Sequence, residues 1–412
     1  MTQPITWIAN PRVRTIDKSQ KAAELFPQET FRQARSFHSK IPAYKISPLK
    51  ALPNLASMLG LGGIWVKDES SRLGLNSFKG LGGSYAIYCF LKQALEVEDF
   101  DIFSEEGAKL VREKIGDITF AAATDGNHGR GVAWAATNLG FKSVIYVHAK
   151  TSSARIKAIE SNGAKVVVIN GTYDDAVEQV YEDSQKNGWQ VISDTSWPGY
   201  TDIPRWVMQG YTTMFSETQE QLAAQGMIKP SHIFVQAGVG SLAAATLGFY
   251  AQLFGSERPR SVIVEPDKAA CLYLSAEVGD GKPHSFAGEL DTIMAGLACG
   301  DPNPQAWDVL WDIADAFVKC PDYVAAKGMR VYGVPLAGDP FIISGESGAA
   351  TLGALMFIMQ LPEYADLRDL LELDNSSEIL LINSEGNTDP DYFRKVVWSG
   401  RHPVPEKYQQ IS

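Results

Sequence analysis

The chain has 412 residues, of which 45% are hydrophobic and 21% charged, as in a soluble globular enzyme long enough for about two domains. Its net charge of −11 excludes the surplus of clustered Lys and Arg that a nucleic-acid groove needs. The first twenty residues lack a continuous apolar stretch and the four cysteines form no CxxC pair, so we expect a cytoplasmic protein with reduced thiols and no secretory signal.

The first strong pattern in chain order is a strand-like run, 64–68, followed by the loop 76–78, Lys79 and an apolar helical stretch, 84–91. A lysine that begins a helix is badly placed for the helix dipole, which favours anions there. A desolvated lysine at this position would suit a Schiff base with an aldehyde. A solvated surface lysine is the simpler interpretation of this motif when it is taken alone.

Strands and helices alternate between residues 117 and 194. Their predicted order is strand 118–123, helix 132–139, strand 143–147, helix 154–162, strand 165–169, helix 173–186 and strand 189–193. Such alternation predicts βαβ units and a parallel sheet. The strands are rich in Val and Ile, which favours a sheet covered on both faces.

Two turns in this region carry polar residues to the carboxyl ends of strands, where open α/β sheets bind ligands. The first, TDGNHGRG (124–131), offers backbone amides to an anion, and Asn127 could donate to a phenolic oxygen. Asp125 is a helix cap in the simpler interpretation. The second turn begins with Asp194, which is either a site residue at the same sheet edge or an ordinary turn residue.

Pro198 and Pro204 then break the pattern, and a helical region, 208–225, follows. We place a domain boundary near residue 200. Because strand 64–68 precedes the compact series, the predicted large domain comprises residues 1–88 and 204–412. The predicted small domain comprises residues 89–203. The fold class is α/β, with a mostly parallel twisted sheet flanked by helices in each domain.

Later predicted strands are 233–236, 261–265 and 378–382. The first leads into Gly238-Val239-Gly240-Ser241 and an apolar helix, a combination that can cradle phosphate. The loop lacks a Walker lysine and is not GxGxxG, so it is not a nucleotide fingerprint, and a simple tight turn is the alternative. The uncharged segment 235–255 contains glycines and polar residues, which favours a buried helix over a membrane span.

The last strand leads to Ser384, whose hydroxyl could hydrogen-bond a heterocyclic nitrogen, although a polar loop explains it when it is taken alone. Together the four motifs resemble the fold type II pyridoxal-phosphate enzymes, the tryptophan synthase β and threonine dehydratase group. The resemblance implies that Lys79 binds pyridoxal 5'-phosphate, that Asn127 supports its ring, that Ser384 meets its pyridine nitrogen, and that its phosphate is held by Gly238, Val239, Gly240 and Ser241.

The pair FKGLGG (78–83) and TDGNHGRG resembles, within that group, the carbon–nitrogen lyases that act on 2,3-diaminopropionate, over about residues 37–389. The resemblance implies α,β-elimination of the D- and L-isomers to pyruvate and two ammonia. A base must remove the Cα proton. We expect Lys79 to do so for the L-isomer and Asp125 for the D-isomer. Asp125 or Asp194 would hold the second substrate ammonium.

Two alternatives stay open: a threonine or serine dehydratase, which would not need the acidic Asp125, and a catalytically silent amino-acid-binding protein. The resemblance also implies a homodimer whose ligand is a small amino acid, with no nucleic-acid or membrane partner. We predict no metal site, although Glu265 and Glu346 resemble positions near the cofactor or a cation in relatives. Whether Cys271 and Cys299 form a disulfide is not decided by the sequence.

Overall fold

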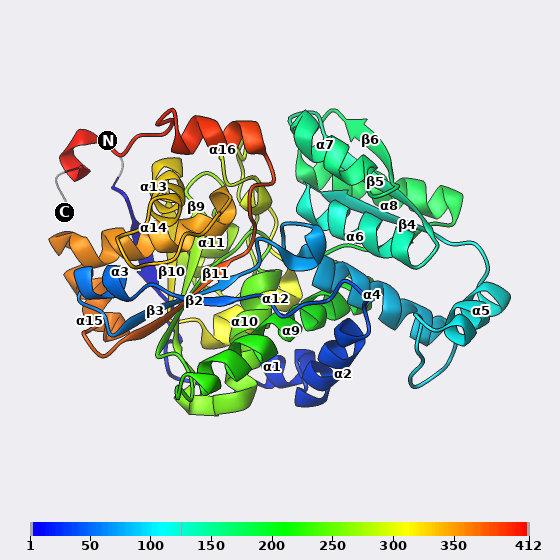
Figure 1. Cartoon of the computed structure of the whole chain (residues 1–412), viewed down its shortest axis with the longest axis horizontal. Coiled ribbons are helices and arrows are strands. Elements are labelled where there is room, and N and C mark those ends of the chain that lie inside the picture. Colours follow the sequence, from blue (N-terminus) through cyan, green and yellow to red (C-terminus); the bar gives the residue numbers. More distant parts are fainter. Residues whose placement is uncertain (1–2, 125, 410–412) are drawn as a thin grey trace.

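The computed structural model describes residues 3–124 and 126–409, and for Asp174 it describes only the backbone. Asp125, a predicted base, therefore lies outside the described residues. The described chain forms a seven-stranded and a four-stranded sheet, each flanked by helices (Figure 1). This architecture confirms the predicted α/β class with two mostly parallel sheets. The domain boundaries near residues 88 and 204 stay a prediction.

The larger sheet is assembled from segments on both sides of the smaller one. Its spatial order is β1 (Thr6–Ala9), β10 (Ala316–Cys320), β9 (Arg260–Pro266), β8 (His232–Gln236), β11 (Glu378–Asn383), β3 (Gly63–Asp68) and β2 (Leu49–Ala51). The inner strands are parallel, whereas β1 and β2 are antiparallel edge strands. The sequence analysis did not predict these two edges, because three or four residues carry too little periodicity to distinguish a strand from a loop.

Both faces of the larger sheet are buried. Ile379 and Leu381 of β11 pack in one core, and Leu380 and Ile382 pack in the other. The first core includes helices α3 (Pro53–Met58), α13 (Asp322–Gly333), α14 (Glu346–Gln360), α15 (Ala365–Leu371) and α16 (Pro390–Val397). The second includes α1 (Gln20–Leu25), α2 (Gln28–Ser39), α9 (Asp202–Ala224), α10 (Ser241–Phe254), α11 (Cys271–Val278) and α12 (Pro304–Ile313). Burial on both faces explains why the inner strands are nearly continuous apolar runs.

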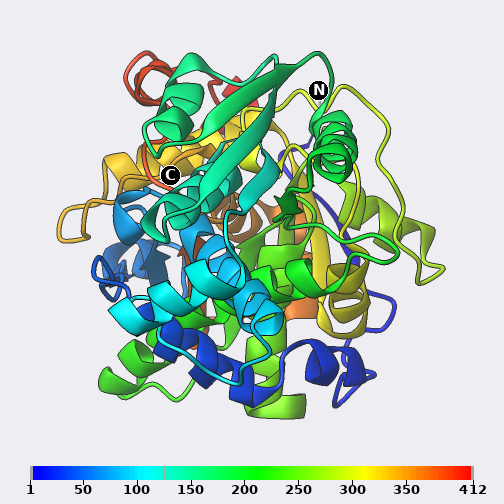
Figure 2. The ribbon, with the colours of Figure 1, turned by 90° about the vertical axis from the view of Figure 1, so that its right-hand side faces the viewer.

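The smaller sheet is entirely parallel, in the order β6 (Lys165–Ile169), β5 (Lys142–His148), β4 (Thr119–Thr124) and β7 (Gln190–Val191). Figure 2 shows it facing the viewer, with α1 and α2 below. Its helices are α5 (Glu105–Lys114), α6 (Asn127–Asn138), α7 (Ser153–Glu160) and α8 (Tyr173–Asn187). A capping box at Thr172 and a left-handed C-cap at Gly188 delimit α8, close to its predicted bounds.

Short 3-10 turns complete the described elements: η1 (Arg72–Gly74), η2 (Gly255–Glu257), η3 (Ala295–Leu297), η4 (Pro362–Tyr364) and η5 (Glu406–Tyr408). The uncharged segment 235–255 forms the end of β8, a loop and α10. Within the described ranges, no helix combines the length and the apolarity that crossing a bilayer requires.

Two predictions for residues 189–208 are wrong. Pro204 does not break the helix, because α9 begins at Asp202 and a proline in the first turn removes no intrahelical hydrogen bond. The last predicted strand of the small sheet is only two residues long. The amide of Ser193 binds the Tyr200 hydroxyl at 3.0 Å rather than a neighbouring strand, so regular pairing ends there.

Helix α4 (Lys79–Ala94) connects the two sheets and packs against both α6 and α9. Where α4 crosses α6, a Cβ on Gly131 would lie 2.9 Å from the carbonyl carbon of Lys79. Where it crosses α9, a Cβ on Gly210 would lie 2.6 Å from the carbonyl oxygen of Leu81. Gly131 and Gly210 therefore allow backbone contact, which holds the start of α4 between the two sheets.

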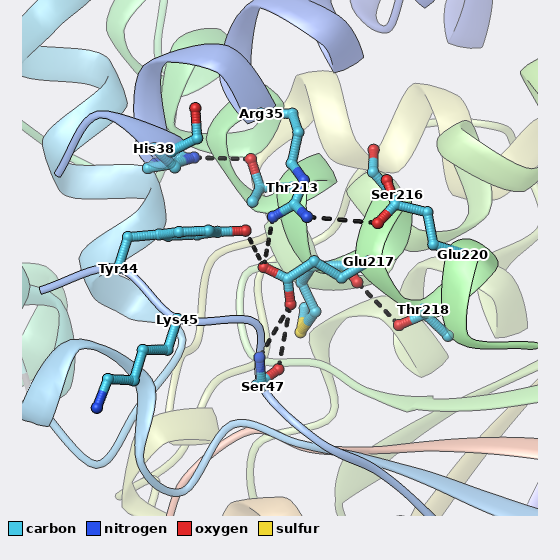
Figure 3. Close-up of polar contacts among 12 residues, drawn as sticks. Arg35, His38, Tyr44, Lys45, Ser47, Thr213, Ser216, Glu217, Thr218 and Glu220 are labelled. Atoms are coloured by element: carbon cyan, nitrogen blue, oxygen red, sulfur yellow. Dashed lines mark hydrogen bonds and ion pairs between the residues drawn. The ribbon is translucent and has the colours of Figure 1, made fainter. Parts of the chain in front are cut away.

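A buried ionic cluster anchors the segment that leads to α4. Glu217 of α9 accepts hydrogen bonds from Arg72 Nη2 at 2.6 Å, Lys67 Nζ at 2.8 Å and Arg35 Nη1 at 3.1 Å. Tyr44 and Ser47 complete its shell (Figure 3). Burial alone would raise the pKa of Glu217, but the hydrogen bonds and charges of Arg72 and Lys67 outweigh it and lower the pKa.

Glu217→Gln should lower the free energy of unfolding by about 3–5 kcal/mol at neutral pH, because the buried cations lose their shared counter-charge. Because the folded pKa of Glu217 is lowered, its contribution is present above the unfolded pKa of about 4.3 and is lost as the pH falls through the folded value. Urea unfolding at pH 7 and at lower pH measures both effects.

The matched control is Glu220→Gln on the same helix, whose side chain is 59% exposed and lies 3.4 Å from Arg35. It should cost at most about 1 kcal/mol. Equal losses in the two variants would contradict a central role for Glu217.

Candidate active site

A cavity that is partly open to solvent lies at the carboxyl ends of strands from both sheets. Every predicted site residue within the described part of the chain lines it, namely Lys79, Asn127, Asp194, Gly238, Val239, Gly240, Ser241 and Ser384. These residues follow β4, β7, β8 and β11 or begin α4. Parallel strands thus bring four separate motifs to one place.

Lys79 and Asp194 form an ion pair across this cavity, between Lys79 Nζ and Asp194 Oδ2. The other carboxylate oxygen accepts a hydrogen bond of 3.0 Å from the Tyr173 hydroxyl. Burial would lower the pKa of Lys79, but the Asp194 carboxylate outweighs it and raises the pKa above its ordinary value. Burial would raise the pKa of Asp194, but Lys79 and His128 outweigh it and lower the pKa. The charged pair is therefore the favoured state.

His128 lies beside this pair and is buried. Its Nε2 lies 2.8 Å from the carbonyl oxygen of Ile192, which can only accept, so Nε2 carries the hydrogen. Its Nδ1 is 3.9 Å from Asp194 Oδ2. Burial lowers the pKa of His128, and the Asp194 carboxylate opposes this effect.

Asn127 begins α6 and points to a second acidic group of the cavity. Its Nδ2 donates to Glu385 Oε2 at 2.5 Å, and the amide of Ser347 donates to Glu385 Oε1 at 3.1 Å. Thr124 holds the turn before Asn127, because its Oγ1 accepts from the amides of Gly126 and Gly129. Asn127 and Glu385 thus lie together although one comes from each sheet.

The loop 238–241 meets α10 at Gly240, whose φ of +100° favours glycine. The backbone amides of residues 238–241 donate no hydrogen bond to the described part of the chain. Ser241 Oγ donates to the carbonyl oxygen of Asp194 at 2.6 Å and accepts from Asn303 Nδ2 at 3.0 Å. The loop is therefore fixed to the smaller sheet while its amides stay open to an anion.

Glu265 and Glu346 differ in their relation to this cavity. Glu265 accepts from the amides of Leu272 and Tyr273 at the start of α11, and burial raises its pKa to about 8. Glu346 lies next to Ser347, which lines the cavity, and burial together with Glu385 raises its pKa to about 7 despite Arg155. Among the described residues, no three His, Cys, Asp or Glu side chains are grouped to hold a metal ion.

No disulfide joins Cys271 and Cys299. Both thiols are buried, and Cys299 lines the cavity.

Several residues that line the cavity received no role from the sequence, among them the polar residues Tyr173, Gln236 and Glu385. Gln236 ends the predicted strand 233–236, two positions before Gly238, and Glu385 directly follows Ser384. Their position at a strand exit is the signal that could have identified them. Tyr173 had no such signal, because it begins a helix and reaches Asp194 only through the fold.

The chain is similar in sequence and in structure to proteins of one family. A family model described as pyridoxal-phosphate dependent enzyme matches residues 41–385. The chain is 45% identical over 368 residues to the diaminopropionate ammonia-lyase of Salmonella typhimurium, covering 89% of this chain and 91% of the relative.

Two crystal structures of the Escherichia coli diaminopropionate ammonia-lyase are also similar. The complex with D-serine has a TM-score of 0.89 and 43% identity, covering 97% of this chain and 98% of the other. The complex with an aminoacrylate-PLP azomethine reaction intermediate has a TM-score of 0.88 and 42% identity, covering 98% and 99%.

Asp194→Asn should lower the pKa of Lys79 below its ordinary value of about 10.4, because burial would then act without the opposing charge. Reductive methylation of the cofactor-free protein with ¹³C-formaldehyde and an NMR pH titration of the Lys79 methyl resonance measures this pKa. Tyr173→Phe is the control, since it removes one hydrogen bond but leaves the Asp194 charge, and should change the pKa far less. An unchanged Lys79 pKa in Asp194→Asn would contradict the ion-pair assignment.

Proposed function

This chain belongs to the pyridoxal-phosphate dependent enzymes and, among them, to the diaminopropionate ammonia-lyases, and we propose that the cavity around Lys79 is its active site. The enzyme is a carbon–nitrogen lyase that uses pyridoxal phosphate to eliminate ammonia from diaminopropionate. The family assignment favours this reaction over a dehydratase and over a catalytically silent binding protein. The observation that carries the site assignment is the convergence of Lys79, Asn127, Ser384 and the loop 238–241 on one cavity.

The residues of the cavity fit the cofactor. The open amides of residues 238–241 and the N-terminus of α10 suit its phosphate, and the Lys79 amine suits its aldehyde. Asn127 would support the ring oxygen and Ser384 the pyridine nitrogen. When bound, pyridoxal phosphate withdraws electrons from the substrate Cα and so weakens its Cα–H bond.

Lys79 and Asp194 share the proton chemistry on one side of the site. Lys79 Nζ, once it has lost its proton, can take the Cα proton of the L-isomer. Asp194 holds Nζ through Oδ2, while Tyr173 holds Oδ1 and so fixes the carboxylate. The anionic Asp194 also attracts a substrate ammonium, which selects a substrate with two amines.

Glu385 adds a second carboxylate to the lining of the cavity. Its two oxygens are held by Asn127 and by the amide of Ser347, so its position is defined. With Asp194 it makes the cavity suitable for a ligand that carries two amino groups. A hydroxyl leaving group, as in serine or threonine, would gain nothing from this charge.

Asp125 is the proposed base for the D-isomer. The residues on either side of it, Thr124 and Gly126, line the cavity. The similar Escherichia coli enzyme binds D-serine, which supports access of a D-amino acid to such a site. We further propose that the products are pyruvate and two ammonia, and that the enzyme is a cytoplasmic homodimer.

Borohydride reduction of the purified holoenzyme should place a pyridoxyl group on Lys79. Peptide mapping by mass spectrometry measures this, and the other lysines of the same digest, including the buried Lys67, serve as internal controls. Lys79→Ala should lose both the adduct and the visible absorption of the bound cofactor. An adduct on another lysine would overturn the site assignment.

Asp125→Asn should reduce kcat/KM for D-diaminopropionate by about 10²–10⁴-fold, the usual contribution of a general base, with a much smaller effect on the L-isomer. Pyruvate release from each enantiomer measures the two rates. Asp194→Asn is the comparison variant and should impair both isomers, because its carboxylate contacts Lys79. Equal losses for both isomers in Asp125→Asn would remove Asp125 as the stereospecific base.

A further inference from the structure

Gln236 is a fully buried polar residue at the end of β8 that the reaction described above does not use. Its Nε2 donates to the carbonyl oxygen of Ile382 at 3.0 Å and to the Oγ of Ser384 at 2.6 Å. Strands β8 and β11 are parallel neighbours, so their carboxyl ends lie side by side. Gln236 and Ser384 both line the cavity.

The orientation of the Gln236 amide follows from its partners. The carbonyl oxygen of Ile382 can only accept, so the group that faces it must be the NH₂ and not the amide oxygen. A flipped amide would place two oxygens 3.0 Å apart, whereas the observed orientation gives Nε2 two acceptors and leaves Oε1 as the amide atom without a partner among the described residues. The NH₂ carries two hydrogens, and these serve Ile382 and Ser384 together.

This orientation decides the polarity of the Ser384 hydroxyl. A serine hydroxyl has one hydrogen to donate and lone pairs to accept with. Because Gln236 already donates to Ser384 Oγ, the hydroxyl hydrogen must point elsewhere. Among the described residues no acceptor takes it, and the remaining direction is the cavity that both side chains line.

We propose that Gln236 is a positioning residue that fixes the Ser384 hydroxyl as a hydrogen-bond donor toward the pyridine nitrogen of the cofactor. That nitrogen then accepts the hydrogen bond and carries no proton of its own. The proposal rests on the proposed function, in which Ser384 meets this nitrogen. Its consequence is a cofactor ring that withdraws less charge from the substrate carbon than a protonated ring would.

The experiment is ¹⁵N NMR of the holoenzyme loaded with pyridoxal phosphate that is ¹⁵N-labelled at the pyridine nitrogen. The wild type should resonate in the range of a neutral, hydrogen-bonded pyridine. Ser384→Ala removes the donor and should move the resonance toward that of a neutral pyridine without a hydrogen bond. Gln236→Glu should move it equally far, because a carboxyl oxygen would accept the Ser384 hydrogen and turn it away from the ring.

Gln236→Met serves as a second variant if Gln236→Glu does not fold. It removes the donor without adding an acceptor, so its resonance should lie between those of the wild type and Ser384→Ala. The matched control is Gln209→Glu, because Gln209 is a buried glutamine of α9 whose Nε2 donates to the carbonyl oxygen of Leu25 at 2.8 Å. This control should leave the resonance at the wild-type position.

Three results would overturn the proposal: a wild-type resonance in the pyridinium range, a Ser384→Ala resonance at the wild-type position, or wild-type resonances in the folded Gln236 variants. Failure of the proposed function is a different result, since the wild type would then bind no cofactor at Lys79. The visible spectrum and the Lys79 adduct, measured before the NMR, separate the two cases.

Discussion

The contact between Lys79 and Asp194 joins the two sheets at the edge where both carry their polar turns. Neither charge is stable alone at this depth, because burial opposes the charged form of each. Each therefore depends on the other being in place, and the position of each is set by a different sheet. The geometry of the cavity follows from this mutual dependence.

Several contacts of the surrounding structure hold Lys79 and Asp194 in place. Glycines let α4 approach α6 and α9 until backbones touch, which locates Lys79. On the opposite side, Ser241 and Asn303 bind the carbonyl oxygen of Asp194, so the loop before α10 is linked to the same point. The Glu217 cluster links α9 and α2 to Arg72, in the segment that precedes α4. A site whose residues come from the ends of four strands needs these contacts, because a small displacement of a reacting group lowers the reaction rate.

The hydrogen bonds of the cavity also restrict what each polar group can still do. Tyr173 and Lys79 occupy the two oxygens of Asp194, while Asn127 and Ser347 occupy those of Glu385. The donors of the cavity that stay without a partner in the described part of the chain are chiefly the backbone amides of residues 238–241. These donors decide which ligand groups the cavity can bind, because a buried polar group without a hydrogen bond raises the free energy of the complex.

The sequence alone was enough to predict the strands that end in polar turns, the helices α7 and α8 to within two residues, and eight of the residues that line the cavity. These features are local, because hydrophobic periodicity and turn residues report on neighbouring positions. Only the tertiary structure decided the partners: Lys79 with Asp194 across 115 positions, and Gln236 with Ser384 across 148. Only the tertiary structure also revealed the antiparallel edge strands β1 and β2, the position of Pro204 in the first turn of α9, and the buried Glu217 cluster. The physical reason is that burial and pairing depend on residues brought together by packing, which no local pattern records.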